Sequence, residues 1–390
     1  MNIAYILNAT VLSGGATKAF LNLIDGLKAY DVKPFVVAPD GNGVTQELKR
    51  RNIPTCVTTY RSSAYPNCHT LTEKVLFIPR LIARIVAGRH ATKTVTTFLK
   101  ENKIDIVHSN TGVVRIGFDA AQKAGIPHIY HIREYVDCIG IRYFPTKASF
   151  YKQLEKANGY TVCITKGIQK HFRLEGKKTS RVIYDGVFSP KSTMPTAANK
   201  DYFLFVGRIQ WVKGVDLLLE AYASYCKQTA LPLPLHIAGS ADDKVYRQEL
   251  EAIVQTHSLQ QHVTFLGECN NIEELMRNAR ALIIPSRNEG FGFCMPEAMI
   301  QGCLAIGRNT AGTKEQLDNG LRVTGEEIGL RYETTEELAA LLAEVSSHPA
   351  DYYRPYTERA FRVVNQLYTQ ESNARQVYTF YKDVLNENGQ

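Results

Sequence analysis

Two carboxylates lie eight residues apart in residues 284–299, which follow an apolar run and lead into a helix-like stretch. Glu289 and Glu297 flank the glycines Gly290 and Gly292. Glycines allow the backbone to approach a ligand closely, and amide groups at a helix start face anions or hydroxyls. Glu297 could therefore hydrogen-bond the vicinal hydroxyls of a ribose. The competing interpretations are a partner for the helix dipole at Glu297 and a capping acceptor at Glu289.

Two cations, Arg208 and Lys213, lie in residues 206–214, directly after another apolar run. An arginine fork and a lysine point charge that converge can neutralise a diphosphate. Most surface cations have no such role, but the position after a strand favours one here. The pair indicates an anion site at the end of a strand.

His131 ends a third apolar run, and Arg133 and Glu134 follow it closely. A histidine can exchange protons near neutral pH, so this cluster would suit catalysis or contact with an acceptor. A structural His–Glu pair explains the same residues about as well.

Paired glycines, Gly14 and Gly15, precede a helix-like stretch near the N-terminus. They could admit an anion to the backbone amides, and a plain tight turn explains them equally well. Residues 12–18 match neither G-x-G-x-x-G nor G-x-x-x-x-G-K-[ST], so neither a dinucleotide fingerprint nor a Walker site is supported.

Short apolar runs alternate with longer amphipathic stretches, which predicts strands and helices of parallel α/β units. The predicted strands are residues 3–7, 33–37, 104–108, 128–130, 160–164, 202–206, 235–238, 263–265, 281–284 and 304–306. The predicted helices are residues 17–30, 44–51, 71–88, 91–102, 112–124, 215–226, 245–256, 272–278, 296–301, 335–346 and 370–386. Ligands bind beyond the carboxyl ends of such strands, where the four segments above fall.

Residues 188–200 are small and polar, interrupt the alternation and form the best candidate for a linker. The sequence therefore predicts an α/β protein with two doubly wound parallel sheets. We expect an N-terminal domain over 1–190 and a C-terminal domain over 191–368. A final helix in 369–390 is expected to pack back on the N-terminal domain.

The chain has 390 residues, 44% hydrophobic and 22% charged, with a formal net charge of +8. These values exclude disordered, collagenous and coiled-coil proteins. No signal sequence or membrane-spanning run is apparent, so we expect a cytoplasmic protein. The eight cysteines include no C-x-x-C pair, which argues against a disulfide framework and a zinc cluster.

Residues 51–100 hold eight cations against one anion, so this stretch carries a net +7. Apolar residues lie among the cations at helical spacing, which suits an anionic membrane surface or an acidic acceptor. A core-facing helix with a solvated basic edge is the alternative. We expect Pro79 to lie in the first turn of a helix and Gly88 to end it. The candidate membrane-docking residues are Arg80, Arg84, Arg89 and Lys93.

These residues resemble glycosyltransferases of the GT-B fold, in particular the large retaining family 4, also called group 1. The likeness covers essentially the whole chain. Its strongest element is Glu289 to Glu297 within E-G-F-G-F-C-M-P-E-A-M, close to the family pattern E-x-F-G-x-x-x-x-E-A-M. Asp185 stands where the family more often has Asn. The further matches are Gly14-Gly15, Gly207-Arg208, Lys213-Gly214, residues 105–108 and residues 184–187.

The resemblance implies a role for several residues of these segments. Glu289 and His131 would be catalytic, with His131 beside the reacting anomeric carbon. Residues 267–271 would lie near the base of the nucleotide. The donor-binding residues would be Gly14, Gly15, Arg208, Lys213, Phe291, Gly292, Phe293 and Glu297. The acceptor-side residues would be Asn110, Arg133 and Tyr135, all in the N-terminal domain.

The implied reaction is the retaining transfer of a hexose or N-acetylhexosamine from a nucleotide-diphosphate sugar, with a UDP-sugar favoured. The acceptor would be a hydroxyl of a saccharide or lipid-linked molecule in polysaccharide or glycolipid synthesis. We expect no cofactor and no metal, because the sequence lacks a D-x-D triplet. We expect no nucleic-acid partner, and peripheral contact with the inner face of the cell membrane. The alternatives are a nucleotide-sugar 2-epimerase of the same fold and a non-catalytic sugar-nucleotide-binding subunit.

Overall fold

A computed structural model describes residues 1–12, 14–66, 70–135, 141–143, 146–154, 159–196 and 200–389. Ser13, Cys68, Cys138 and residues 197–199 of the predicted linker lie outside this part of the chain. The chain divides into two compact units. Unit 1 comprises residues 1–186 and 370–390, and unit 2 comprises residues 187–369.

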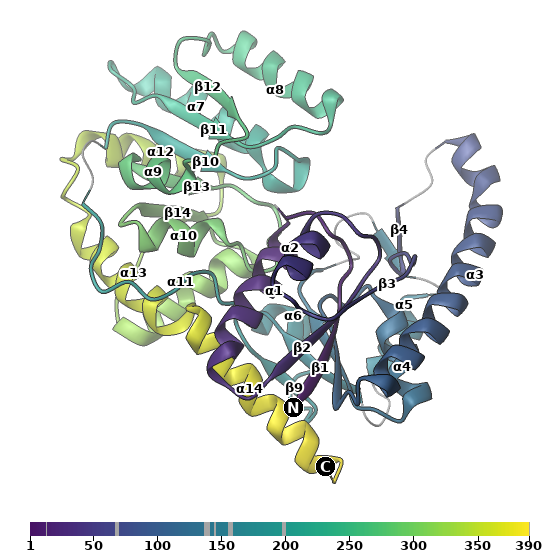
Figure 1. Cartoon of the computed structure of the whole chain (residues 1–390). Coiled ribbons are helices and arrows are strands. Elements are labelled where there is room, and N and C mark those ends of the chain that lie inside the picture. The colour runs from purple at the N-terminus through teal and green to yellow at the C-terminus, as the bar shows by residue number, and fades with distance from the viewer. Residues whose placement is uncertain are drawn as a thin grey trace. The chain divides into compact units, whose positions relative to one another are not determined.

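Unit 1 is built on a parallel sheet of seven strands (Figure 1). The strands are β1 (Asn2–Ile6), β2 (Lys33–Ala38), β3 (Thr55–Val57), β5 (Ile106–Ser109), β6 (His128–Ile132), β8 (Gly159–Cys163) and β9 (Ser180–Val182). Their order is β3-β2-β1-β5-β6-β8-β9, so the direction of winding reverses between β1 and β5. A short antiparallel pair, β4 (Ala64–Pro66) and β7 (Ile141–Tyr143), stands apart from this sheet. The central strands are buried on both faces, as helix-covered parallel strands must be.

The helices of unit 1 cover both faces of its sheet. They are α1 (Gly15–Gly26), the 3₁₀ turn η1 (Leu27–Ala29), α2 (Val44–Arg50), α3 (Leu71–Glu101), α4 (Arg115–Ala124), α5 (Lys147–Leu154), α6 (Lys166–His171) and α14 (Gln370–Glu387). The last helix of the chain packs along α1: Tyr378 stacks on Tyr30 at 4.5 Å. A Cβ added to Gly26 would lie 2.8 Å from that of Ala374, so this glycine lets the two helices approach.

Helix α3 is one helix of 31 residues, and the predicted break near Gly88 is wrong. Pro79 lies inside this helix rather than in its first turn. The second half of α3 is anchored by Ala91, Val95 and Leu99, which are buried against the sheet and α4. A single glycine costs a helix about 1 kcal/mol, which this packing outweighs. The first half of α3 is exposed, and it extends past the sheet of unit 1 (Figure 1).

Unit 2 contains a second parallel sheet, in the order β12-β11-β10-β13-β14-β15. The strands are β10 (Phe203–Val206), β11 (Leu235–Ala238), β12 (Val263–Gly267), β13 (Ala281–Ile284), β14 (Leu304–Arg308) and β15 (Leu330–Tyr332). The helical elements are η3 (Trp211–Lys213), α7 (Val215–Gln228), α8 (Lys244–Thr256), α9 (Ile272–Asn278), α10 (Cys294–Ile300), α11 (Ala311–Thr324), α12 (Thr335–Ser347) and α13 (Arg354–Leu367). Winding reverses between β10 and β13, which brings the loops after these two strands together.

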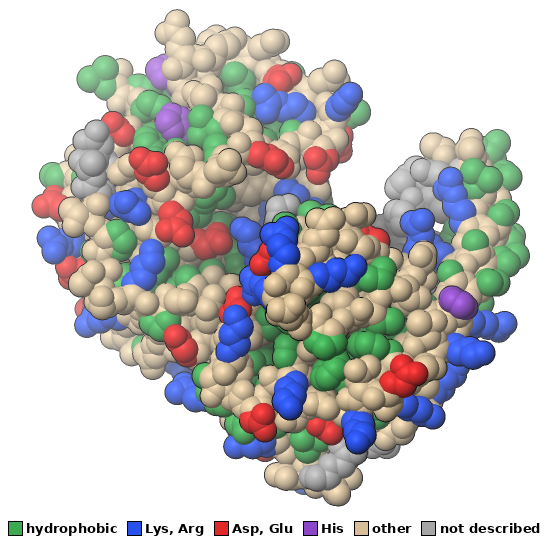
Figure 2. Space-filling model, viewed as in Figure 1, with side chains coloured by type: hydrophobic (Ala, Val, Ile, Leu, Met, Phe, Trp, Pro, Cys, Tyr) green, Lys and Arg blue, Asp and Glu red, His purple; other side chains and the backbone are tan. Residues whose placement is uncertain are grey.

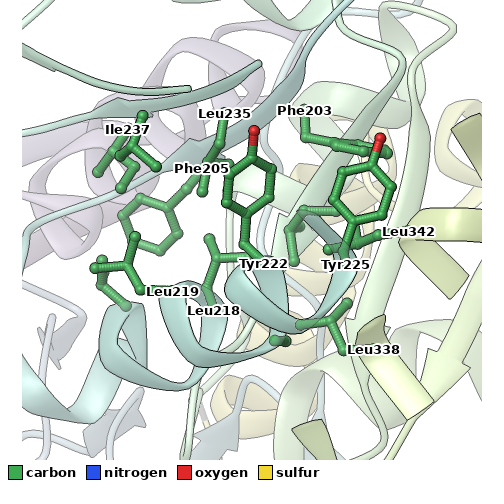
Figure 3. Packing of buried hydrophobic residues seen from close by; sticks show 14 of the residues in the cluster. Phe203, Phe205, Leu218, Leu219, Tyr222, Tyr225, Leu235, Ile237, Leu338 and Leu342 are labelled. Carbon is green, nitrogen blue, oxygen red and sulfur yellow. The ribbon is translucent and has the colours of Figure 1, made fainter. Parts of the chain in front are cut away.

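The core of unit 2 lies between its sheet and the helices α7 and α12. Leu218, Leu219 and Tyr222 of α7 face the side chains of β10 and β11 (Figure 3). The Tyr222 hydroxyl donates to the carbonyl of Leu233 at 2.7 Å, which satisfies its one polar group within the core. This packing fixes β10 and the loop that follows it.

The predicted architecture of two Rossmann-like parallel sheets is confirmed, and each predicted strand overlaps an observed one. The short strands β3, β4, β7, β9 and β15 and the helices α5, α6, α11 and α13 were not predicted. No helix within the described ranges is both long and apolar enough to cross a bilayer.

Candidate functional site

Unit 2 places two predicted donor-binding residues and the predicted catalytic residue Glu289 on the two loops at its switch point. The loop after β10 carries Arg208 and Lys213, and the loop after β13 carries Glu289. These strands are neighbours in the sheet, with Phe203 paired to Ala281, so both loops leave the same edge. The two sequence motifs, 76 residues apart, are thereby brought into contact.

Lys213 and Glu289 form the central pair of this site. The Lys213 ammonium donates to both carboxylate oxygens of Glu289, at 2.9 and 2.7 Å. Ser286 adds a hydroxyl hydrogen bond to Glu289 at 3.0 Å. Burial acts to lower the pKa of Lys213, but the Glu289 carboxylate outweighs it and the pKa is raised. The lysine is therefore a fixed positive charge at neutral pH.

Two further charges and a cysteine thiol lie near this pair. Arg208 is exposed, and its positive charge acts to lower the pKa of Lys213, although the net effect of all neighbours is to raise it. Glu297 lies in the first turn of α10 and is half-buried. The Cys294 thiol is acted on by Glu289, Lys213 and Glu297, so it lies among all three. Burial, reinforced by Glu289, raises the pKa of Cys294 to about 12, so this thiol is a neutral packing group.

Three glycines, two of them at positive φ, allow the loops of the site to pack closely. Gly214 has φ +70°, and a Cβ there would lie 2.2 Å from the carbonyl oxygen of Pro285. Gly292 has φ +88°, and a Cβ there would lie 2.8 Å from Cγ of Glu289. Gly312 at the start of α11 lies against the carbonyl groups of residues 289–291. Only glycine fits these positions, and they fix the Lys213 and Glu289 loops to each other.

Arg287 braces the Lys213 loop from the side. Its guanidinium makes a bidentate ion pair with Asp216, at 2.8 and 2.6 Å, and donates to the Trp211 carbonyl at 2.7 Å. The same guanidinium lies 4.3 Å from the centre of the Trp211 ring. Sequence reasoning did not predict this brace, because neither Arg287 nor Asp216 is part of a recognised motif pattern.

Two buried acceptors near Glu289 are unsatisfied within the described part of the chain. They are Oδ1 of Asn288 and Oε1 of Gln316. The amide nitrogen of Gln316 donates to the carbonyls of Phe291 and Gly292, which sets the turn that carries these predicted residues. Buried polar atoms without a partner are uncommon and mark places where a ligand or water completes the structure.

In unit 1, His131 lies at the end of β6, buried and beside a second histidine. Its Nδ1 lies 3.1 Å from Nε2 of His108 and 3.2 Å from the guanidinium of Arg133. Arginine can only donate, so Nδ1 of His131 accepts and the proton of the neutral ring is on Nε2. Burial, reinforced by the Arg133 charge, lowers the pKa of His131 well below its ordinary value. Nε2 of His131 has no hydrogen-bond partner among the described residues.

Arg133 is itself buried, in an ion pair with Asp185. Burial raises the pKa of Asp185, and Arg133 opposes that effect. Asn110 accepts from Arg133 through its backbone carbonyl at 2.9 Å and donates to the carbonyl of Ala16 at 2.9 Å. The predicted acceptor-side residues Asn110 and Arg133 thus belong to a buried network that holds His131 and the start of α1.

The C-terminal helix reaches the same network. The Tyr381 hydroxyl lies 2.6 Å from Nδ1 of His108 and 3.2 Å from the Tyr5 hydroxyl. Nε2 of His108 must donate to reach the accepting Nδ1 of His131, so Nδ1 of His108 accepts from Tyr381. A chain of hydrogen bonds therefore runs from α14 through His108 to His131. The sequence analysis assigned no role in the site to His108, which lies in the matching residues 105–108, and it did not single out Tyr381.

The remaining predicted residues have simpler surroundings. Gly14 precedes α1 and provides no side-chain cap, and a Cβ added to Gly15 would meet open space. The Tyr135 ring lies edge-on to His171 at 5.2 Å. Phe291 is buried and Phe293 half-buried, with their ring centres 6.0 Å apart.

Among the described residues, no three His, Cys, Asp or Glu side chains gather as metal ligands would.

The part of the chain that carries Lys213 and Glu289 is similar to a known protein family. Residues 192–362, nearly all of unit 2, match the family model described as glycosyl transferases group 1. The uncharacterized glycosyltransferase MJ1178 of Methanocaldococcus jannaschii is 26% identical over 235 residues, 59% of this chain and 63% of that protein. The lipopolysaccharide core biosynthesis mannosyltransferase LpcC of Rhizobium leguminosarum is 28% identical over 47% of this chain and 51% of its own length. The chain thus aligns with less than two thirds of either relative.

Solved structures share the whole fold. The crystal structure of Anabaena Alr3699/HepE in complex with UDP has a TM-score of 0.74 and 19% sequence identity, and the match covers 98% of this chain and 100% of that one. This likeness extends the comparison to unit 1, beyond the reach of the family model. Unit 2 is therefore similar to the glycosyl transferases group 1 family, and the chain as a whole has the GT-B fold.

Proposed function

We propose that this protein is a glycosyltransferase that moves a hexose or N-acetylhexosamine from a nucleotide-diphosphate sugar to a hydroxyl of a saccharide or lipid-linked acceptor. The observation that carries the proposal is the Lys213–Glu289 pair at the switch point of the unit 2 sheet. This is the position at which open parallel sheets bind ligands.

The charges suit a diphosphate. Arg208 and Lys213 supply two positive charges, and Glu289 and Glu297 supply two negative ones. The attraction for an anion therefore comes from the placement of the two cations and not from a net positive charge. Lys213 is mostly shielded from solvent, which strengthens its attraction for an anion compared with an exposed lysine. Arg208 is exposed and can present its fork to phosphate oxygens.

The same cations would lower the barrier to transfer. Breaking the bond between sugar and diphosphate builds negative charge on the leaving group, and fixed positive charges stabilise that charge more as it grows. The glycines that hold Lys213 and Glu289 keep this geometry in place before the reaction begins. We propose that transfer is metal-independent and retains the anomeric configuration, with the acceptor attacking the face that the diphosphate leaves.

The names of similar proteins support the proposed classes of donor and acceptor. The Anabaena protein has been crystallised with UDP and with UDP-glucose, which favours a UDP-sugar as donor here. The name of the Rhizobium relative refers to lipopolysaccharide core biosynthesis, which supports a saccharide or lipid-linked acceptor. Glu297 is proposed to bind the ribose. His131 is proposed to donate its Nε2 proton to a substrate hydroxyl, since that N–H is buried and makes no hydrogen bond to a described residue, with Oδ1 of Asp185 3.8 Å away.

A thermal-shift screen with UDP-, GDP-, ADP- and TDP-sugars would identify the donor, because a ligand that binds the folded state raises the melting temperature. Assays with that donor, with and without saccharide and lipid-linked acceptors, would then test transfer. Lys213→Ala and Glu289→Ala should abolish it while circular dichroism shows both variants folded. Lys314→Ala, which breaks an exposed ion pair on α11, is the control. Near-wild-type transfer in either site variant would contradict the proposal, and product from donor alone would indicate an epimerase.

A further inference from the structure

The first half of α3 carries apolar side chains that are left exposed by the described residues of unit 1. Each of the following is at least 36% exposed: Leu71, Val75, Ile78, Ile82, Ile85 and Val86. Their spacing of three and four residues places all six within roughly 100° of arc on a helix with 3.6 residues per turn. We call this set the apolar stripe. Folded proteins rarely expose contiguous apolar surface of this kind unless it meets a partner.

The apolar stripe points away from the body of unit 1. The residues that anchor α3, Ala91, Val95 and Leu99, are fully buried. At 100° per residue their centre lies roughly 130° around the helix from the centre of the stripe. The stripe therefore cannot be an extension of the core-facing surface of the same helix. Figure 2 shows hydrophobic side chains along the free edge of α3.

The cations of α3 fall into two groups on the same reasoning. Arg89 and Lys93 are exposed and continue the apolar stripe along its own face. Arg80 and Arg84 lie on the far side, roughly 150° or more from the centre of the stripe. The predicted set of four docking cations is thus divided by the helix geometry, and only Arg89 and Lys93 can meet a surface that covers the stripe.

We propose that the apolar stripe, with Arg89 and Lys93, binds the headgroup region of an anionic lipid bilayer. Apolar side chains would enter the boundary between headgroups and acyl chains while the two cations meet lipid phosphates. The apolar stripe could alternatively pack against α3 of a second copy of the protein, because coiled coils also have apolar residues spaced three and four apart. Residues 71–101 hold six cations against two anions, so two copies would repel each other, whereas the same charge attracts anionic lipid.

This inference goes beyond the proposed transfer reaction and does not depend on it, because binding is measured without substrate. The full-length protein is floated with phosphatidylcholine vesicles and with vesicles that also contain phosphatidylglycerol. We expect binding only to the anionic vesicles, and weaker binding at high salt. Each cation near an anionic surface increases the affinity for that surface about fivefold. The double variant Arg89→Gln with Lys93→Gln should therefore weaken vesicle binding about 25-fold. The matched pair Arg80→Gln with Arg84→Gln should weaken it less.

The apolar contribution is tested separately with Ile78→Gln and Ile82→Gln. Both side chains are exposed, so the double variant should remain folded, as circular dichroism would verify, and should lose vesicle binding. Unchanged flotation of this variant, or equal binding to both kinds of vesicle, would overturn the proposal. A dimer of the wild type in sedimentation that the same double variant abolishes would also overturn it, in favour of a second copy.

Discussion

The guanidinium of Arg133 lies 3.2 Å from Nδ1 of His131, and both side chains are buried. Because arginine has no acceptor, this contact fixes which ring nitrogen of His131 carries the proton. The histidine therefore presents an N–H group, not a lone pair, at Nε2. The arrangement suits a hydrogen-bond donor to substrate and does not suit a general base that must accept a proton there.

The tautomer of His131 can be measured directly. In ¹⁵N NMR spectra we expect protonated Nε2 and unprotonated Nδ1 in His131 at pH 7, unchanged at pH 6, because burial and Arg133 lower its pKa. Arg133→Met should change the Nδ1 signal, whereas Arg115→Met, on a partly exposed ion pair with Asp119, should not. A proton on Nδ1 in the wild type would show that the network is assigned wrongly.

Tyr381→Phe should weaken the positioning of His131 indirectly, through His108. The change removes the 2.6 Å hydrogen bond to His108 and leaves a buried acceptor unpaired, at a cost of about 1–3 kcal/mol in unfolding free energy. We expect kcat to fall several-fold with KM for the donor little changed, and the His131 ¹⁵N signals to shift. Tyr378→Phe, on the same helix, keeps its stacking on Tyr30 and is the control. Equal kinetics and spectra in the two variants would refute the connection.

Gly292→Ala should inactivate the enzyme without unfolding it. Its φ of +88° costs an alanine about 1–2 kcal/mol, and the new Cβ would meet Cγ of Glu289 at 2.8 Å, so Glu289 must move away from Lys213. We expect a loss of at least about 100-fold in kcat/KM, or about 2.7 kcal/mol in transition-state binding. Gly325→Ala introduces similar strain at φ +76° with nothing within 4 Å, and should retain activity. Similar activity in both variants would contradict this role for Gly292.

Unit 1 should lose stability as the pH falls below neutrality. Burial lowers the pKa of His128 to about 3, and His108 and His131 are also shifted well below their ordinary values. The unfolded chain takes up these protons near pH 6.5 while the folded unit resists them, so stability is complete above that pH and is lost below it. Each histidine contributes up to about 1.4 kcal/mol per pH unit.

Hydrogen exchange of the β5 and β6 amides between pH 7.5 and 5.5 would check this dependence, after correction for the intrinsic exchange rate. His128→Gln should reduce the slope, and His257→Gln, at the C-cap of α8 in unit 2, should leave it unchanged. Equal protection across the range in the wild type would mean that these histidines bind protons in the folded state.

The sequence predicted those elements whose physical signal is local. Buried parallel strands such as β10 (FLFV) and β13 (ALII) are continuous apolar runs, so both were found. Helix α11 was missed because Gly312 and Gly320 lie inside it, and these glycines are there for close packing. Strand β9 has three residues of mixed character and gives no pattern.

The residues of the site likewise comprise some that local sequence patterns predict and others that depend on long-range packing. Lys213 and Glu289 were predicted because each lies directly after a recognisable strand, and parallel topology brings such ends together. The contact of His108 with Tyr381 joins residues 273 positions apart and depends on where α14 packs, which no local pattern specifies. The division of the α3 cations likewise required a continuous helix, whereas the sequence suggested a break at Gly88.

The most direct test of nucleotide-sugar binding uses the single tryptophan of the chain. Trp211 lies two residues before Lys213 and is 60% exposed, so its fluorescence should report a ligand at this loop. We predict that UDP changes the emission of the wild type saturably. Lys213→Ala should weaken the apparent affinity at least about 100-fold, while Lys314→Ala leaves it unchanged. Equal affinity for UDP in wild type and Lys213→Ala, or no response to UDP, GDP, ADP or TDP, would contradict the account.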